Sequence, residues 1–228
     1  MHAVLIRGPE ACFTRPESTA DRFTYPVITP SAAGGIIRNI YWHPNIQVDV
    51  REICVCRPIH YTRYGFTQVN KVGSLNNLMK KSMYVDSTNK NGKFDNRRLT
   101  TEVYLTDVKY IVHFEYQSNL PGKVKKAGEI FERRMRRGET YYNITLGLTH
   151  LPGCVSTPKD EDYEEVLPIT RDFGTVIHDI DQHVSPAVPY TFQCRMESGR
   201  IQVPSFWDTV ASSWADVDED EGGYQWGL

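Results

Sequence analysis

Two runs of basic residues give this sequence its clearest chemical signal. Residues 123–137 carry seven bases and two acids, and residues 63–98 carry eight bases and two acids. Lysine and arginine at such density neutralise phosphates and release the counterions that surround a nucleic acid. A solvated helix face or an exposed loop would account equally well for either run alone. The two runs together predict a polyanionic partner.

The run at residues 123–137 supplies most of the candidate phosphate contacts. Four arginines fall within five residues, so they cover more than one face of a helix and some of them must meet a partner. The candidates in this run are Lys123, Lys125, Arg133, Arg134, Arg136 and Arg137. The candidates in the other run are Arg97 and Arg98, together with Lys80 and Lys81.

Two tyrosines follow the first run directly. Tyr141 and Tyr142 come just after Gly138, where the helix is expected to end. Exposed aromatic rings stack nucleic-acid bases with little sequence preference, so Tyr141 is a candidate for base stacking. A place in the core is an equally simple role for one of the pair.

Charge, cysteines and the N-terminus narrow the class of protein. Residues 208–221 hold six acids and no base, and without them 26 bases face 22 acids, a charge of +4. The five cysteines are scattered, and the close pair Cys54 and Cys56 lacks the spacing of a zinc knuckle, so we expect no metal or cofactor. Four apolar residues at the N-terminus are too few for a signal peptide. These features favour a cytoplasmic protein with reduced thiols.

Hydrophobic periodicity and turn residues place these groups on elements. We expect strands at residues 3–7, 53–58, 102–116, 144–148, 176–180, 190–196 and 200–203. One helix is expected to begin at Pro30 with Ser31 as its cap and to close at Pro44. A second helix is expected over 125–137, an acidic loop over 159–165, and a hairpin turn over 197–200.

The order of these elements predicts an α+β fold. A ferredoxin-like (RRM-type) domain would occupy residues 1–150, with a basic insertion at about 63–98. A small antiparallel β lobe would follow over residues 151–204. An acidic, disordered tail would complete the chain over residues 205–228.

Two blocks of sequence carry a resemblance to a known family. The first block comprises residues 11–17, 21–27, 29–36 and 40–44, the last reading Ile-Tyr-Trp-His-Pro. The second block comprises residues 172–174 and 178–181, with residues 57–59 in support. Together they closely resemble the Cas-five family of CRISPR subtype I-C, the Dvulg type. The match runs in order over most of residues 3–204.

The resemblance implies a function in CRISPR RNA handling. Members of this subtype cut the precursor RNA at the base of the repeat hairpin and stay on the 5′ handle as a subunit of the type I surveillance (Cascade) complex. The expected cut needs no metal, because a ribose 2′-hydroxyl attacks its own phosphodiester and leaves a 2′,3′-cyclic phosphate. The protein assists proton transfer and stabilises the growing negative charge.

The resemblance also implies where the catalytic residues lie. The family motif has a tyrosine in a Tyr-Trp-x-Pro turn, which is Tyr41 here, and a Lys-His pair before the second helix. The lysine falls on Lys126, with Lys123 and Lys125 as alternatives, and the histidine falls on Ala127. His43 is the nearest histidine to Tyr41 and the candidate replacement.

Two functions of different class therefore stand side by side. The first is a metal-independent endoribonuclease with Tyr41 and Lys126 at its centre. The second is a non-catalytic subunit that binds the 5′ handle, which Ala127 favours because it cannot transfer a proton. A general RNA-binding protein outside CRISPR is a third interpretation.

Overall fold

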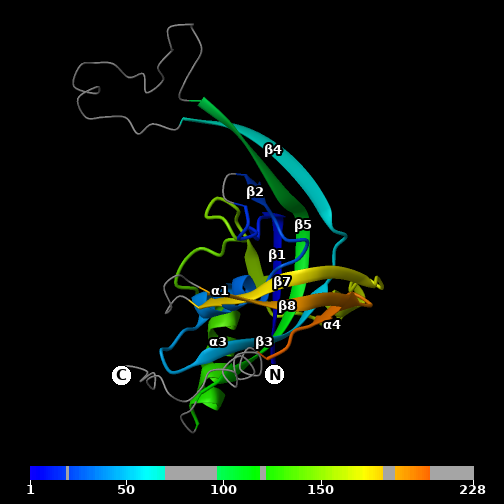
Figure 1. Ribbon diagram of the computed structural model, residues 1–228. Coiled ribbons are helices and arrows are strands. Elements are labelled where there is room, and N and C mark those ends of the chain that lie inside the picture. Colours follow the sequence, from blue (N-terminus) through cyan, green and yellow to red (C-terminus); the bar gives the residue numbers. More distant parts are fainter. Residues whose placement is uncertain (19–20, 70–96, 119–121, 182–187, 206–228) are drawn as a thin grey trace, which may run out of the picture.

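The computed structural model describes residues 1–18, 21–69, 97–118, 122–181 and 188–205. Within them the chain forms a mixed fold dominated by one nine-stranded sheet, with few helices (Figure 1). The strands are β1 (His2–Ala11), β2 (Arg22–Phe23), β3 (Gln47–Val55), β4 (His60–Val69), β5 (Arg97–Gln117), β6 (Cys154–Ser156), β7 (Arg171–Asp181), β8 (Val188–Glu197) and β9 (Arg200–Gln202). The helices are α1 (Pro30–Ile40), α3 (Lys123–Arg137) and α4 (Asp160–Glu164).

The sheet is antiparallel along its whole main path. Its order is β6-β1-β5-β3-β9-β8-β7, with β4 pairing β5 and the short β2 adding the one parallel pair among the described strands. Strands β7, β8 and β9 thus continue the same sheet beyond β3. In Figure 1 the long β4 and β5 extend together away from α1 and α3.

Strand β5 is central because both of its faces are covered. Tyr110, Val112 and Phe114 face the main core under α1 and α3, whereas Ile111 faces a second cluster on the opposite side. The alternation shifts at Asp107, whose φ of 50° interrupts the regular strand, so that Leu105 and Val108 both face the main core.

Helix α1 forms where the sequence predicts it but has a different cap. The hydroxyl of Thr29 accepts the backbone N–H of Ala32 at 3.2 Å, so Thr29 caps the helix and the prediction of Ser31 was wrong. Pro30 occupies the first helical position, where its missing N–H costs nothing. The buried face, which includes Ile37 and Ile40, packs on β3 and also against β7.

Helix α3 was predicted to within two residues at its start. Gly138 ends it in the left-handed region, with φ 66°, and its N–H reaches the last turn of carbonyls. The buried face consists of Ala127, Gly128 and Phe131, and the Phe131 ring packs edge-on to Phe114, with ring centroids 5.0 Å apart.

Two expectations need correction, and a third is not tested. Residues 63–98 were expected to form an insertion, but strand pairs occupy both ends of this range. Strands β4 and β5 pair from His60 opposite Thr106 to Val69 opposite Arg97. Residues 70–96 lie outside the described part. Residues 144–148 form no strand and contribute only an isolated bridge between Thr145 and Pro152. The tail expected over residues 205–228 lies outside the described residues from residue 206 onward.

The hairpin turn at residues 197–200 is confirmed. Ser198 and Gly199 have φ of 47° and 76°, and Glu197 pairs with Arg200 across the turn. Two successive positive φ angles match the twist of a two-residue hairpin, and Gly199 adopts its angle without strain.

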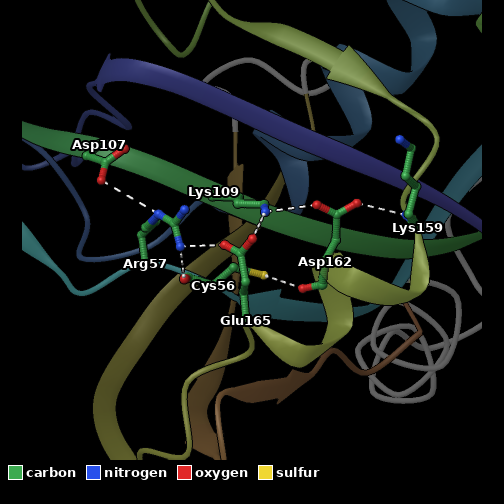
Figure 2. A network of polar contacts seen from close by, with 7 residues as sticks. All are labelled: Cys56, Arg57, Asp107, Lys109, Lys159, Asp162 and Glu165. Carbon is green, nitrogen blue, oxygen red and sulfur yellow. Dashed lines mark hydrogen bonds and ion pairs between the residues drawn. The ribbon is translucent and has the colours of Figure 1, made fainter.

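The acidic stretch 159–165 was expected to be a loop, but it contains α4. An ion-pair network holds α4 on the face of the sheet opposite α1 and α3, called the outer face below (Figure 2). Lys109 on β5 is largely buried, and its Nζ lies 2.8 Å from carboxylate oxygens of both Asp162 and Glu165. Arg57 contacts Glu165 and Asp107 beside it. Figure 2 shows these side chains converging between β5 and α4.

The five cysteine thiols are free, and Cys54 and Cys56 lie buried on the same outer face, as their spacing predicts. Burial raises the pKa of the Cys54 thiol to about 12 and that of Cys56 to about 11, so both stay protonated. None of the helices in the described ranges has the length and apolarity that a membrane crossing requires.

The Lys109 network yields a stability prediction. Burial alone would lower the pKa of Lys109, but its two carboxylates outweigh burial and raise it. Lys109→Met keeps the aliphatic stem and removes the charge, which should lower the free energy of unfolding at pH 7 by about 3 kcal/mol. Urea denaturation checks this, and Lys125→Met, a change at a solvent-exposed side chain of α3 outside the network, serves as the control.

The stability difference between wild type and Lys109→Met should depend on pH. Hydrogen bonding to Lys109 holds the pKa of Asp162 and of Glu165 below their ordinary values of 3.8 and 4.5. Their stabilising effect is therefore complete above those values and is lost as the pH falls below them. The difference between wild type and Lys109→Met should shrink in acid; a difference that stays constant down to pH 3 would contradict the assignment.

Candidate functional site

Tyr41 stands where α1 ends. It is the C-cap residue of the helix, with extended backbone angles of −146° and 124°, and its N–H donates to the carbonyl of Ile37 at 3.1 Å. Its half-buried ring packs edge-on to Tyr116 at the end of β5, with centroids 6.2 Å apart. The core thus orients the ring, while part of the side chain stays accessible.

Arg134 of α3 is the cation that meets Tyr41. Its Nη1 donates to the carbonyl of Ile40 at 2.8 Å, and its guanidinium carbon lies 5.5 Å from the centre of the Tyr41 ring and 4.7 Å from that of Tyr141. A cation at a helix C-terminus is favoured by the exposed carbonyls, and the two rings add cation–π attraction. Arg134 therefore joins α1, α3 and the chain that follows α3.

That following chain is fastened to α1 by Asn39. The amide of Asn39 donates to the carbonyl of Tyr142 at 2.9 Å and accepts the N–H of Tyr142 at 2.8 Å. The backbone carbonyl of Asn39 accepts the N–H of Tyr141 at 2.9 Å. Three hydrogen bonds from one residue fix the backbone, whereas the Tyr141 and Tyr142 rings are exposed.

The remaining arginines of α3 spread around the helix. Arg133, Arg136 and Arg137 are exposed, and Arg137 reaches Glu139 at 3.5 Å. Lys125 is exposed as well, and Lys123 is half-buried. Arg134 is thus engaged inside the fold, Arg137 pairs with Glu139 at the surface, and Arg133 and Arg136 remain available to a polyanion.

The sequence matches one known protein family over most of its length. The model of the family described as CRISPR-associated protein (Cas_Cas5) matches residues 3–204. The chain belongs to this family. Its relatives include two proteins named CRISPR pre-crRNA endoribonuclease Cas5d. That of Mannheimia succiniciproducens is 30% identical over 221 residues, covering 89% of this chain and 94% of the relative. That of Thermus thermophilus is 30% identical over 225 residues, covering 89% and 90%.

Solved structures share the fold. One described as a CRISPR-associated protein superposes with a TM-score of 0.62 at 23% identity, covering 89% of this chain and 91% of that one. A chain of a CRISPR RNA-guided surveillance complex superposes with a TM-score of 0.51 at 14% identity, covering 90% and 89%. At these identities the likeness concerns the fold alone.

The second half of the expected Cas5 motif lies apart from Tyr41. Lys126 is exposed on α3, eight residues before Arg134, or about 12 Å along the helix. Ala127, at the position of the motif histidine, is completely buried under α3. Its small side chain packs in the core and carries no titratable group.

His43 lies in the turn after Tyr41. Its Nδ1 accepts the N–H of Asn45 at 3.2 Å, and the ring is half-exposed. This bond holds Nδ1 as the acceptor and leaves Nε2 free of that turn. Of the other predicted contacts, Arg98 is exposed on β5, and the side chain of Arg97 lies outside the described part.

The sequence alone did not predict that Arg134 contacts Tyr41. It also did not predict that Tyr116 packs on Tyr41, or that His2 packs on Tyr116. The His2 ring packs 5.8 Å from the Tyr116 ring and so close to Gly128 that a Cβ there would lie 2.5 Å from it. Its Nδ1 lies 3.4 Å from Glu132. Gly128 is the one available signal, since a glycine inside a helix often marks a close approach.

A cluster of metal-type donors occurs elsewhere, on β3 and β5. Donor atoms of Glu52, Cys54 and His113 lie within 4.8 Å of one another. Arg200 already places a guanidinium 2.7 Å from Glu52 and 3.6 Å from the Cys54 sulfur. The cluster is balanced by the protein's own cation, and it lies on the outer face, away from Tyr41.

Tyr116 provides a test of the site's packing. Its hydroxyl is buried without a hydrogen-bond partner among the described residues, and burial raises its pKa. Removing an unsatisfied buried hydroxyl should stabilise the protein, so Tyr116→Phe should raise the free energy of unfolding by about 1 kcal/mol. The measurement is urea denaturation at pH 7.

Tyr104→Phe is the matched control. The hydroxyl of Tyr104 is buried too, but it donates to Glu102. Its removal should therefore destabilise the protein, opposite in sign to Tyr116→Phe. Loss of stability in both variants would show that the Tyr116 hydroxyl does have a partner.

Proposed function

We propose that this protein binds the repeat-derived 5′ handle of CRISPR RNA and cleaves precursor CRISPR RNA without a metal ion. The observation that carries the proposal is Tyr41, a half-buried tyrosine at the end of α1 whose ring meets the fixed guanidinium of Arg134. The two Cas5d relatives, which bear the name of a pre-crRNA endoribonuclease, support it. We place the activity in the cytoplasm, with other subunits of a type I surveillance complex as partners.

The fold proposed for this activity is a ferredoxin-like, RRM-type frame. The four strands β6, β1, β5 and β3 lie in that order and pair antiparallel throughout, with α1 following β1 and α3 following β5. This is the order of the split β-α-β fold. We assign residues 1–150 together with β6 to the RNA-binding domain, and β7, β8 and β9 to an added β lobe.

The proposed reaction is an internal transesterification. The 2′-oxygen of the ribose forms a bond to the adjacent phosphorus as the bond to the 5′-oxygen breaks. The 2′-hydroxyl loses a proton and the leaving 5′-oxygen gains one, so no other reactant is consumed. Tyr41 is assigned to proton transfer at the reacting oxygens.

The second requirement is stabilisation of negative charge on the phosphoryl oxygens. Arg134 lies next to Tyr41 and keeps donors beyond the one bonded to Ile40. Lys126 is assigned to the same RNA segment as an electrostatic contact farther along α3. His43, whose Nε2 is free of the turn, is the histidine nearest to Tyr41 in sequence and is assigned the proton that Ala127 cannot carry.

A specific observation favours the second function, a handle-binding subunit without cleavage. Ala127 replaces the motif histidine and is wholly buried. Binding would then rest on the same exposed arginines, with Tyr41 as a packing residue. Cleavage assays separate the two functions.

The cleavage prediction uses the cognate repeat RNA in EDTA. Wild-type protein should cut it, and Tyr41→Phe should cut about 10²- to 10⁴-fold more slowly with RNA affinity retained, because it loses only the ionisable hydroxyl. Lys126→Ala should lower the rate as well. Single-turnover rates on labelled RNA provide the measurement.

Tyr61→Phe is the control, since Tyr61 is an exposed tyrosine on β4. Tight binding without any cleavage by wild type would leave the handle-binding function standing. Cleavage that persists in both Tyr41→Phe and Lys126→Ala would show that the site is misplaced. Equal affinity for an unrelated hairpin would exclude both functions.

A second prediction concerns the salt dependence of RNA binding. Arg133→Gln and Arg136→Gln should each reduce the slope of log affinity against log salt by about 0.7 to 0.9, since each removes one released counterion. Filter binding at four salt concentrations measures the slope. Arg195→Gln on β8, where Arg195 pairs with Glu197 at 3.2 Å, should leave it unchanged.

A further inference from the structure

An open groove lies between α1 and the chain after α3. It has a volume of about 490 Å³ and is lined by Gly35, Arg38, Asn39, Trp42, Tyr141 and Tyr142. Its size falls in the range of small-molecule sites. Trp42 directly follows Tyr41, so the groove begins one residue from the proposed reaction centre.

The walls of the groove are unusually aromatic for a surface. Trp42, Tyr141 and Tyr142 are 55%, 51% and 81% exposed. Large aromatic rings that gather in the open on one surface mark a binding site, because water contacts apolar area that a partner would cover. Ring faces with polar edges suit the stacking of bases, at about 1–3 kcal/mol for each base.

The groove is held in shape before any partner arrives. The three hydrogen bonds of Asn39 fix the backbone of Tyr141 and Tyr142, and Arg134 packs against the Tyr141 ring at 4.7 Å. At Gly35 a Cβ would meet nothing within 4 Å, so the absent side chain leaves that wall open. Rigid rings lose little entropy on binding.

The charge of the lining favours RNA over a protein segment. Arg38 contributes a guanidinium, none of the six lining residues is a carboxylate, and the exposed arginines of α3 lie on the neighbouring helix. Aromatic rings beside arginines and without acids complement a base attached to a phosphate.

We propose that this groove holds one unpaired nucleotide of the RNA, next to the phosphate that Tyr41 faces. The base stacks on Trp42 and Tyr142, and Arg38 contacts its phosphate. This assignment rests on the proposed function and adds to it the subsite that fixes the scissile bond. The groove thereby selects RNA in which a single-stranded nucleotide adjoins the hairpin.

The experiment places 2-aminopurine at each unpaired position of the repeat RNA in turn. Tyr41→Phe serves as the background so that the RNA stays intact, and emission is read in EDTA at saturating protein. One position should be quenched, because stacking quenches 2-aminopurine. Adding Trp42→Ala or Tyr142→Ala should restore the emission and weaken affinity about 5- to 150-fold.

Two controls keep the result specific. Trp42→Phe retains a ring and should keep the quenching. Phe66→Ala removes an exposed ring from β4 and should leave emission at the quenched position unchanged. Circular dichroism of each variant verifies that it is folded.

Each remaining outcome overturns a defined claim. Tight binding of repeat RNA with emission unaffected by Trp42→Ala and Tyr142→Ala would overturn the groove assignment and leave the proposed function intact. Normal RNA binding by these variants, with loss of association with other complex subunits, would make the groove a protein interface. Failure of the unsubstituted protein to prefer repeat RNA would overturn the proposed function itself.

Discussion

Backbone pairing by strand β5 is the constraint on which the molecule depends. This one strand of 21 residues hydrogen-bonds to β1 and β3 along its second half and to β4 along its first. A strand with partners on both edges and side chains buried on both faces cannot shift register without exposing one core and stranding polar groups. The irregular residue Asp107 lies between the two halves, where β5 passes from one set of neighbours to the other.

The candidate site is built at the far end of that strand. Tyr116 lies near the end of β5, where it pairs with Val48 of β3. Its ring contacts both the Tyr41 ring and the Phe131 ring. The chain then enters α3, which returns Arg134 to the end of α1. The site thus combines one residue that the core orients with one cation that a neighbouring helix supplies. Fixed groups of this kind stabilise charge without reorganising during a reaction.

The two faces of the sheet use charge differently. On the outer face, Lys109 and Arg57 meet Asp162 and Glu165 in a closed network that fixes α4. On the helical face, Arg134 contacts Tyr41 and Arg137 pairs with Glu139, whereas Arg133 and Arg136 are exposed. Paired charges hold the fold in place, and unpaired charges of one sign are left for a polyanion.

Local patterns identified much of this structure. The start and end of α3, the turn at Ser198 and Gly199, and the common face of Cys54 and Cys56 follow from caps, turn residues and the alternation of a strand. The acidic stretch at 159–165 could not be read as a helix, because its helix depends on Lys109, fifty residues away in the chain. The extension of β4 and β5 into the basic run was equally hidden, since pairing between strands compensates for weak apolar patterning.

The sequence by itself determined the family, through the blocks at residues 11–44 and 172–181, and determined the basic character of α3. Through the resemblance it also led to the prediction of Tyr41 as a catalytic residue. Only the tertiary structure decided that Arg134, rather than Lys126, contacts Tyr41. It also decided that Ala127 is buried in the core and that Trp42 lines a groove with Tyr142. The reason is physical: residue types and spacing specify what each side chain can do, but contacts between α1 and α3 arise from the shared sheet that carries both helices.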